Sequence, residues 1–513
     1  MDAAVPDLTV GVVGAGTMGR GIAQVALAAG CRVVLTDARP EAADAARDGL
    51  AETFGRLAAK GRMTPQAAEQ AAGRLHLATE PGSSFAGCAV VVEAIAEDLE
   101  AKRRLFARLE EAVPASCVLA TNTSSLSVSA VAAATRHPDR VAGFHFFNPV
   151  PLMRLVEVVA GCRTAPATVA FLRDLAGRFG HLPVNVADTP GFVVNHAGRG
   201  FGPEALRIAA EGVAAPAEID RILTEQAGFR MGPFELFDLV GLDVSAAVMG
   251  SLFDQFFAEP RFRPSHLVAP RVAAGLLGRK TGRGFYEYHD GRIVRPPEPP
   301  TEPPAPDSPA RPVWISRAGG AQSLRLAAIL AAAGVEVETG PRPGRGSLCL
   351  VLPLGADATA AALAERLDPE RTLAVDPLLE LDRRRVAMAT PVTRPDMRAA
   401  ARRALGCDGT PVSVIADSPG FVSQRVLAMI VNVACDIAQQ RVAAPTDIDA
   451  AVTRGLGYPR GPLEWGDWLG PGRVLEVLTT LYALTGEPRW RPSPWLRRRA
   501  QLGVSLLTPE GQP

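Results

Sequence analysis

The stretch from Thr9 to Asp37 constrains the fold more than any other part of the chain. An apolar run, Val10–Val13, leads directly into Gly14-Ala-Gly-Thr-Met-Gly19, and apolar residues then recur at helical spacing as far as Gly30. A second apolar run follows and ends at Asp37. A strand, a GxGxxG turn, a helix and a second strand ending in an acidic residue together predict a dinucleotide-binding βαβ unit.

Each residue of this turn has its own expected task. Gly14 allows the tight turn, Gly16 lets a pyrophosphate approach the backbone, and Gly19 lets the helix pack closely on the strand. The free N–H groups at the start of the helix, including those of Thr17 and Met18, are expected to face the phosphates.

Asp37 decides which dinucleotide is expected. An acidic residue at the end of the second strand accepts hydrogen bonds from both hydroxyls of a ribose. A 2′-phosphate would meet the same carboxylate, so the sequence predicts NAD rather than NADP, although Arg39 is close enough to weaken that preference. A glycine-rich turn without a ligand is the alternative, but the strand, the helix and the acid all stand where the fingerprint requires them.

Charge and cysteine content argue against several classes of function. With 54 Lys and Arg against 54 Asp and Glu, the formal net charge is zero, which predicts no nucleic-acid partner and no membrane surface. No apolar run reaches membrane-spanning length, and the start MDAAVPDLTV does not resemble a secretory signal. The seven cysteines are scattered without a CxxC, so we expect no metal site, no disulfide framework and a cytoplasmic location.

The order of the apolar patterns predicts an α/β chain of several domains, in keeping with its 513 residues. Strand and helix patterns alternate at first, which predicts an N-terminal doubly wound, Rossmann-type parallel sheet as the NAD-binding domain (1–187), with a helical hairpin after its second strand. An all-α domain (188–294) and a Pro-rich linker (295–312) follow. We expect a degenerate sheet domain at 313–411 and a repeated all-α domain at 412–513.

The last domain is predicted from an internal repeat. VADTPGFVVN (Val186–Asn195) matches IADSPGFVSQ (Ile415–Gln424), and GPFEL from Gly232 matches GPLEW from Gly461 at the same offset. In the second sheet domain, however, the first predicted strand leads into Ser-Arg-Ala-Gly-Gly instead of GxGxxG. We therefore expect no cofactor site in the second half.

Polar residues that can carry chemistry follow the predicted strands. His145 comes directly after the predicted strand Val141–Phe144, Ser124 lies in TNTSS after another strand, and Glu157 lies in the apolar run LVEVV, where it needs a partner. Ligands of doubly wound sheets bind at the carboxyl ends of strands, and these groups suit alcohol oxidation, in which a base takes the hydroxyl proton. Each residue also has a structural alternative. His145 could be a structural histidine, the TNTSS segment could form a turn or a helix cap, and Glu157 could be one half of an ion pair.

A series of motifs resembles the 3-hydroxyacyl-CoA dehydrogenase family, the NAD-linked enzymes of β-oxidation. They cover residues 8 to 288 in the family's order: GVVGAGTMGRGIA, VVEAIAEDLEAK, TNTSSLSV, GFHFFNPVPLMRLVEVV, DTPGFVVN, GPFELFDLVGLD and GRKTGRGFY. The whole architecture resembles a longer bacterial branch, whose members act on 3-hydroxyadipyl-CoA in phenylacetate degradation or on 3-hydroxybutyryl-CoA. The resemblance implies NAD-dependent oxidation of a short (S)-3-hydroxyacyl-CoA, with or without a distal carboxylate.

The resemblance also implies roles for single residues. His145 would be the general base, Glu157 would hold its imidazole, and Ser124 and Asn195 would bind the substrate oxygen and nearby groups. Lys60, on the helical hairpin, would lie against the CoA moiety. Four further positions match family positions near the cofactor: Glu97, Lys102, Asn148 and Lys280.

Two departures from the family pattern stand out. His196 follows the motif asparagine where the family usually has arginine, and Gln424 takes the place of Asn195 in the repeat. The repeat also has no counterpart of HFFNP (His145–Pro149) near Val386–Pro391, so we expect no active site in the second half. The second half is expected either to replace a second subunit or to shape the acyl pocket, so a homodimer and a monomer with an internal pseudo-dimer both remain open. The rival functions are oxidation of a 3-hydroxy acid without CoA and non-catalytic binding of acyl-CoA and NAD as a scaffold.

Overall fold

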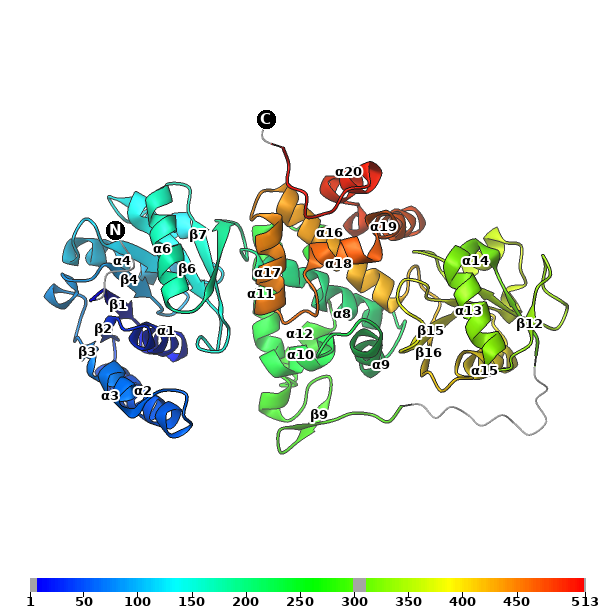
Figure 1. Cartoon of the computed structure of the whole chain (residues 1–513), viewed down its shortest axis with the longest axis horizontal. Coiled ribbons are helices and arrows are strands. Elements are labelled where there is room, and N and C mark those ends of the chain that lie inside the picture. Colours follow the sequence, from blue (N-terminus) through cyan, green and yellow to red (C-terminus); the bar gives the residue numbers. More distant parts are fainter. Residues whose placement is uncertain (1–6, 299–310, 512–513) are drawn as a thin grey trace. The chain divides into compact units, whose positions relative to one another are not determined.

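The computed structural model describes residues 7–298 and 311–511, which form two compact units (Figure 1). One unit comprises the residues up to His196 together with Gln440–Gly457, and the other comprises Ala197–Gln439 and the residues from Tyr458 onward. The sequence placed residues 440–457 within the repeated all-α domain, so the units are not the consecutive segments that it predicted. Most of the predicted Pro-rich linker, residues 299–310, lies outside the described residues.

An eight-stranded sheet forms the centre of the first unit, with the strand order β3-β2-β1-β4-β5-β6-β7-β8. Neighbouring strands run parallel except β6 and β7, which are antiparallel. The predicted doubly wound, mainly parallel sheet is therefore confirmed. Its strands are β1 (Thr9–Val13), β2 (Arg32–Thr36), β3 (Leu75–Leu77), β4 (Val90–Glu93), β5 (Val118–Thr121), β6 (Val141–Phe146), β7 (Leu155–Ala160) and β8 (Leu182–Ala187).

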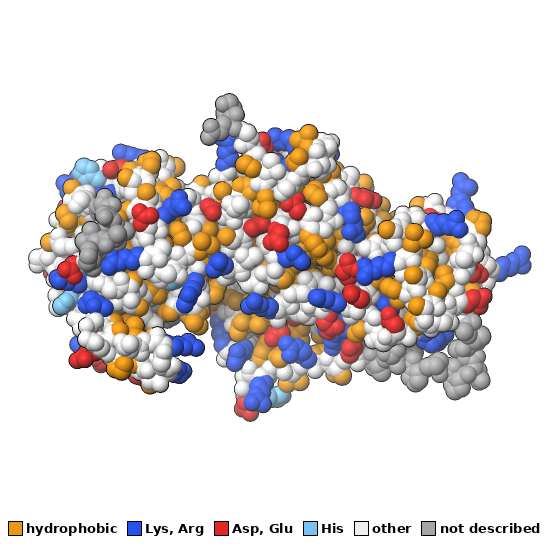
Figure 2. All heavy atoms as spheres, viewed as in Figure 1, with side chains coloured by type: hydrophobic (Ala, Val, Ile, Leu, Met, Phe, Trp, Pro, Cys, Tyr) orange, Lys and Arg blue, Asp and Glu red, His pale blue; other side chains and the backbone are white. Residues whose placement is uncertain are grey.

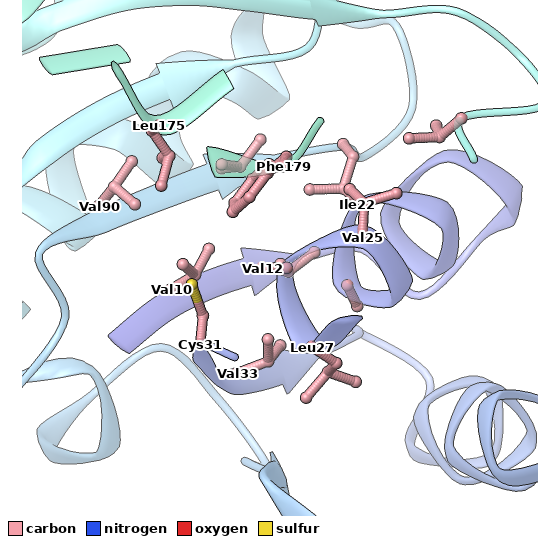
Figure 3. Close-up of a cluster of buried hydrophobic side chains, with 14 of the residues drawn as sticks. Val10, Val12, Ile22, Val25, Leu27, Cys31, Val33, Val90, Leu175 and Phe179 are labelled. Atoms are coloured by element: carbon pink, nitrogen blue, oxygen red, sulfur yellow. The ribbon is translucent and has the colours of Figure 1, made fainter. Parts of the chain in front are cut away.

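Helices cover both faces of this sheet, which is why its central strands read as continuous apolar runs. Val10, Val12 and Ile22 belong to the core on one face, shown in Figure 3, and Phe85 and Phe106 are buried on the other. The helices are α1 (Thr17–Ala28), α2 (Pro40–Ala59), α3 (Pro65–Gly73), α4 (Leu99–Ala112), α5 (Val128–Ala132), α6 (Pro166–Arg178) and, from the distant segment, α17 (Pro445–Gly455); α7 (Val194–Ala197) stands where the chain passes to the second unit.

The second unit contains a six-stranded sheet of order β12-β11-β13-β14-β15-β16, in which β14 and β15 are antiparallel. The apolar runs Val313–Ile315, Val335–Val337 and Leu348–Leu352 predict strands near the first three, whereas the other three were not predicted. β16 lies beyond the predicted boundary at residue 411. The strands are β11 (Val313–Ile315), β12 (Val337–Glu338), β13 (Leu348–Val351), β14 (Thr372–Val375), β15 (Arg385–Ala389) and β16 (Val412–Ala416). A separate hairpin is formed by β9 (Glu287–His289) and β10 (Arg292–Val294).

The remaining helices of the second unit belong to the two α repeats or cover the second sheet. They are α8 (Gly202–Ala210), α9 (Pro216–Arg221), α10 (Pro233–Val240), α11 (Leu242–Gln255), α12 (Val268–Ala273), α13 (Gly320–Ala332), α14 (Ala358–Ala364), α15 (Pro395–Leu405), α16 (Val422–Gln439), α18 (Pro462–Leu469), α19 (Pro471–Thr485) and α20 (Pro494–Leu502). Within the described residues, no single helix meets the length and hydropathy needed to cross a membrane, and the pair α10 and α11 does so only jointly, with a bend of 102°. Figure 2 shows acidic and basic side chains interspersed over the visible face.

The two halves of the chain exchange backbone hydrogen bonds in a reciprocal pattern. In the first unit the amide of Ala187, at the end of β8, donates to the carbonyl oxygen of Val442 at 2.8 Å. In the second unit the amide of Ala416, at the end of β16, donates to the carbonyl oxygen of Val213 at 3.0 Å. These four residues are corresponding positions of the repeat, so the last strand of each sheet is bonded to the α repeat of the other half.

Candidate active site

The loop between β1 and α1 has the shape that its glycines predict. Gly14 has a φ of +107°, and a Cβ there would lie 2.4 Å from the carbonyl oxygen of Ala94. A Cβ at Gly19 would lie 1.7 Å from the carbonyl oxygen of Gly14, whereas a Cβ at Gly16 would meet none of the described residues within 4 Å. Packing within the protein therefore requires glycine at Gly14 and Gly19, while Gly16 faces open space.

This open face fits a dinucleotide. Gly16 is the N-cap of α1, and among the described residues no side chain caps it, so the first-turn N–H groups can bind phosphate. At the end of β2, Asp37 accepts hydrogen bonds from the amides of Ala15 (2.7 Å) and Arg39 (3.0 Å), which fix its carboxylate beside the loop. The residues can hold NAD with its pyrophosphate at the start of α1 and a ribose near Asp37.

His145 and Glu157 lie directly opposite each other on the antiparallel strands β6 and β7. Nδ1 of His145 is 2.7 Å from Oε2 of Glu157, and the two residues are 5% and 0% exposed. The sequence placed His145 after its strand, but β6 continues to Phe146, so His145 lies within the strand. The register of the two strands, which the sequence did not predict, brings the imidazole and the carboxylate together.

The other oxygen of Glu157 is held by backbone groups. Oε1 accepts hydrogen bonds of 2.9 Å from the amides of both Val193 and Val194. Because an ionised carboxylate only accepts, Nδ1 of His145 carries a proton and Nε2 is the basic nitrogen. Sequence reasoning missed these two amides, since every residue type except proline supplies one and no sequence signal marks them.

Glu97 organises the loop that carries Ser124. Its Oε1 accepts hydrogen bonds from the hydroxyl of Thr123 (2.7 Å) and from the amides of Ser124 (2.9 Å) and Ser125 (3.0 Å). Partial burial acts to raise the pKa of Glu97, but the hydrogen bond from Thr123, the charge of Lys102 and the amide of Ser124 outweigh it and lower the pKa to about 2. Glu97 is therefore ionised at neutral pH and holds the loop through several donors at once.

Lys102 is buried between two carboxylates. It is 1% exposed, and its Nζ lies 2.6 Å from Oε1 of Glu93 and 3.2 Å from Oε2 of Glu97. Glu93 also accepts a hydrogen bond of 2.7 Å from the hydroxyl of Thr121. Sequence reasoning missed Glu93, although an acidic residue at the end of the apolar run Val90–Glu93 is a signal that could have found it.

The other predicted residues are more dispersed. Asn195 is half-buried in α7 beside Val194, whereas Asn148 and Lys60 are exposed, after β6 and at the end of α2. Lys280 lies in the second unit, where its Nζ contacts both carboxylate oxygens of Asp243 at 2.6 and 2.7 Å. The structure thus joins His145 with Glu157, and Ser124 with Glu97 and Lys102. Among the described residues there is no group of three or more His, Cys, Asp or Glu placed to hold a metal ion.

The second half has different residues at the corresponding places. Glu157 pairs with Val184 in the first sheet, and Val386 pairs with Ser413 in the second. Val184 and Ser413 are corresponding positions of the repeat, so Val386 takes the place of Glu157. The counterpart of β6, the strand that carries His145, therefore lies before Val386–Pro391.

Asp376 takes the place of His145. It follows β14, and its amide donates a hydrogen bond of 3.0 Å to the carbonyl oxygen of Val386 on the antiparallel neighbour β15. Arg425 is the second-half counterpart of His196. The second half therefore has an arginine at the position where the family usually has one and the first half has His196. The guanidinium of Arg425 is buried within 2.6 Å of Glu204 and 2.5 Å of Glu211.

The first unit thus combines a loop that fits a dinucleotide with a buried histidine whose basic nitrogen is selected by a carboxylate. A protein of this class is a nicotinamide-dependent dehydrogenase.

Comparison with known proteins shows to which family of nicotinamide-dependent dehydrogenases the chain belongs. The family model described as 3-hydroxyacyl-CoA dehydrogenase, NAD binding domain, matches residues 9–189, and the model of the C-terminal domain matches both 191–288 and 420–507. The chain belongs to the 3-hydroxyacyl-CoA dehydrogenase family, and it is an NAD-dependent enzyme of that family. The predicted family and cofactor are therefore confirmed.

Two long relatives share the arrangement of both halves. The 3-hydroxyadipyl-CoA dehydrogenase of Escherichia coli (strain K12) is 39% identical over 500 residues, which are 96% of this chain and 98% of that protein. A crystal structure of 3-hydroxybutyryl-CoA dehydrogenase from Escherichia coli K12 has a TM-score of 0.82 at 37% identity and covers 97% of this chain and 98% of its own. A probable 3-hydroxybutyryl-CoA dehydrogenase of Deinococcus radiodurans is 42% identical but matches 54% of this chain, with 99% of its own length covered.

Proposed function

We propose that the chain oxidises a short (S)-3-hydroxyacyl-CoA to the 3-oxoacyl-CoA, with 3-hydroxyadipyl-CoA as the first candidate and 3-hydroxybutyryl-CoA as the second. The adipyl substrate comes first because the relative named for it is 39% identical to the chain, whereas the long structure named for the butyryl substrate is 37% identical. The activity rests on one observation, the 2.7 Å contact between Nδ1 of His145 and Oε2 of Glu157. An adipyl substrate would place the enzyme in phenylacetate-type degradation, and a butyryl substrate in fatty-acid β-oxidation.

His145 is the general base of the proposed reaction. NAD, when bound, supplies the acceptor for the hydride that leaves C3. Glu157 holds the proton on Nδ1, so Nε2 takes the proton of the 3-hydroxyl group, and the carboxylate stabilises the imidazolium that forms. Both side chains are buried, which strengthens their interaction because little water competes for it. In the reverse direction the imidazolium returns its proton to the oxygen of the substrate.

Other side chains bind and orient the reactants in this proposal. Ser124 and Asn195 bind the substrate oxygen and nearby groups, and Glu97 keeps Ser124 in place through its amide. The exposed Lys60 binds the CoA moiety. Four residues serve the cofactor, directly or through their neighbours: Glu97, Lys102, Asn148 and Lys280.

We also propose that the second half takes the place of a second subunit, which makes the chain a monomer with an internal pseudo-dimer. The reciprocal hydrogen bonds of Ala187 with Val442 and of Ala416 with Val213 support this arrangement. Light scattering on the purified chain should give the mass of one chain, and a mass of two chains would favour the homodimer.

The cysteines support a cytoplasmic location. All seven lie in the described part of the chain as thiols that form no disulfide there, and five of them are buried. Free thiols persist where the medium is reducing, so the structure needs no oxidising compartment for its stability. Fractionation of the native host with an antibody to the chain tests this location.

A panel of 3-hydroxyacyl-CoA substrates tests the proposed function. The butyryl, hexanoyl and adipyl thioesters are compared by following NADH absorbance, and the adipyl thioester should give the highest kcat/KM. Higher activity with the free 3-hydroxy acid than with its thioester would favour the dehydrogenase of non-CoA acids. Failure to reduce acetoacetyl-CoA with NADH would favour the scaffold. Replacing NAD by NADP should abolish most of the turnover because Asp37 repels a 2′-phosphate.

A further inference from the structure

A helix from the second half of the chain is built into the sheet that carries Glu157. Helix α17 packs against β7 and β8 in the first unit. Asp447, in its first turn, accepts a hydrogen bond of 3.3 Å from the amide of Asn185 on β8, and the preceding Val442 accepts one of 2.8 Å from Ala187. The helix is thus bonded along the edge of the catalytic sheet, although the half that supplies it has lost the cofactor motif.

The last turn of α17 reaches the surroundings of Glu157 through a glycine. A Cβ on Gly455 would lie 2.9 Å from Cγ2 of Val194, 3.0 Å from its Cγ1, and 3.0 Å from Cδ2 of Leu155. Separations of this size are at or below the closest that real Cβ atoms show, so a side chain at Gly455 would have to displace one of these two residues. Glycine at this position is therefore a condition for the close approach of the helix.

Both residues that Gly455 touches lead directly to Glu157. The amide of Val194 donates one of the two 2.9 Å hydrogen bonds to Oε1. Leu155 stands two positions before Glu157 on β7, so their side chains share one face of that strand. Val194 itself begins α7, a helix of only four residues, which offers little rigidity of its own. Its position depends on what packs against it.

We propose that α17 is a positioning element of the active site, and that Gly455 is its point of contact. By fixing Val194 and Leu155, the helix fixes the carboxylate of Glu157, and through its 2.7 Å contact it fixes the imidazole of His145. The half without an active site is thereby part of the proton-transfer machinery of the other half. This inference rests on the roles proposed above for His145 and Glu157.

The test is the variant Gly455→Ala, assayed as the full chain with acetoacetyl-CoA and NADH. A shift of the carboxylate by a fraction of an ångström misaligns the base, so kcat should fall about 10- to 100-fold while KM for NADH changes little. Gly177→Ala is the matched control, because it makes the same substitution in the last turn of α6 in the same unit, where a Cβ meets nothing within 4 Å. It should leave kcat unchanged.

A double-mutant cycle separates positioning from general damage to the fold. If Gly455 acts through Glu157, then Gly455→Ala should have little further effect on kcat in a Glu157→Gln background. An undiminished loss in that background, or an unchanged kcat in a folded Gly455→Ala protein, would overturn the inference. If Glu157→Gln alone leaves kcat intact, the proposed function fails and this inference fails with it. If Glu157→Gln lowers kcat but Gly455→Ala does not, only this inference fails.

A second variant disturbs the same contact by loosening the helix instead of crowding it. Asp447→Ala removes the acceptor for the amide of Asn185 and loosens α17 without crowding Val194. It should lower kcat in the same Glu157-dependent manner, by less than Gly455→Ala does. This variant carries the test if Gly455→Ala does not fold, and a kcat equal to that of the wild type would then contradict the proposal.

Discussion

The Nε2 atom of Gln424 donates a hydrogen bond of 2.9 Å to Oδ1 of Asp376. In the second half these two residues stand at the places that Asn195 and His145 take in the first. Asp376 faces a valine instead of a carboxylate, and its sheet has no GxGxxG turn. The second half therefore lacks both the oriented imidazole and the cofactor loop, and we expect all turnover to come from the first half.

This expectation gives a prediction for His145. His145→Gln should lower turnover by about 10²- to 10⁴-fold, because general-base catalysis is lost and the second half supplies no substitute. NADH binding, measured by fluorescence, should be retained. His76→Gln is the control, since His76 is an exposed histidine of the same sheet, on β3. Unchanged turnover in His145→Gln would remove His145 from the mechanism.

Glu157→Gln tests the orientation of the imidazole. Oε1 accepts two backbone N–H groups, so the amide oxygen of glutamine should stay there and its NH₂ group should face Nδ1 of His145. Nδ1 must then accept a hydrogen bond, which moves the proton to Nε2 and blocks the base. We expect kcat to fall substantially, but by a smaller factor than in His145→Gln, because the imidazole is present but wrongly held, with KM little changed.

The control for this variant is Glu110→Gln. Glu110 is a buried carboxylate that binds the amides of Arg136 and His137 away from the proposed site. Its loss should lower the melting temperature but leave kcat near that of the wild type. If both variants reduce kcat equally, the effect of Glu157→Gln reflects the loss of any buried carboxylate and says nothing about the tautomer of His145.

The glycine loop allows a matched pair of substitutions. Gly16→Ala adds a methyl group that meets no atom of the described residues within 4 Å, so the melting temperature of the free protein should not change. NADH binding should weaken by about tenfold, or about 1.4 kcal/mol, because the methyl group occupies the approach to the backbone. Gly19→Ala should destabilise the fold itself, since its Cβ would lie 1.7 Å from a carbonyl oxygen. Equal effects of both variants on stability would argue against a phosphate site at Gly16.

Local sequence patterns predicted much of the fold. The β1–α1–β2 unit and the helical hairpin α2–α3 were expected, and Thr64 caps α3 by accepting the amide of Ala67 at 3.1 Å. The strands β14, β15 and β16 were missed, because short apolar runs in an alanine-rich chain show no periodicity that separates strand from helix. The packing of α17, from the second half, on the sheet of the first unit could not be predicted, since it depends on contacts between distant segments.

For the candidate site too, the sequence predicted some features and not others. His145, Glu157, Ser124 and Asn195 were proposed because their side chains stand in recognisable motifs. The register that sets His145 opposite Glu157 and the amides that hold Glu157 were not predicted, because neither pairing nor backbone donors leave a mark in the sequence. Position in a motif gave the candidates, while the three-dimensional structure was needed to show how they are held.

Asp376 should destabilise the folded chain at neutral pH. The residue is fully buried, and within the described structure its Oδ2 has no hydrogen-bond partner. Burial raises the pKa of Asp376 to about 6, against the opposing effects of the hydrogen bonds from Gln424 and from the amide of Leu378. The folded protein thus holds this proton more tightly than the unfolded chain does, so the contribution of Asp376 to stability falls as pH rises from about 4 to about 6.

Asp376→Asn removes this titration, because the amide is neutral at every pH tested. The variant should match the wild type near pH 4 and exceed its free energy of unfolding by about 1–3 kcal/mol near pH 7, as measured by urea denaturation across that range. Asp408→Asn is the control of opposite sign, since hydrogen bonds from Arg385 lower the pKa of Asp408. Its loss should destabilise the protein at pH 7 and nearly as much at pH 4, because this stabilisation is lost only as the pH falls further, toward the lowered pKa. A lower stability of Asp376→Asn at both pH values would show that the hydrogen bond from Gln424 outweighs the cost of burying the charge.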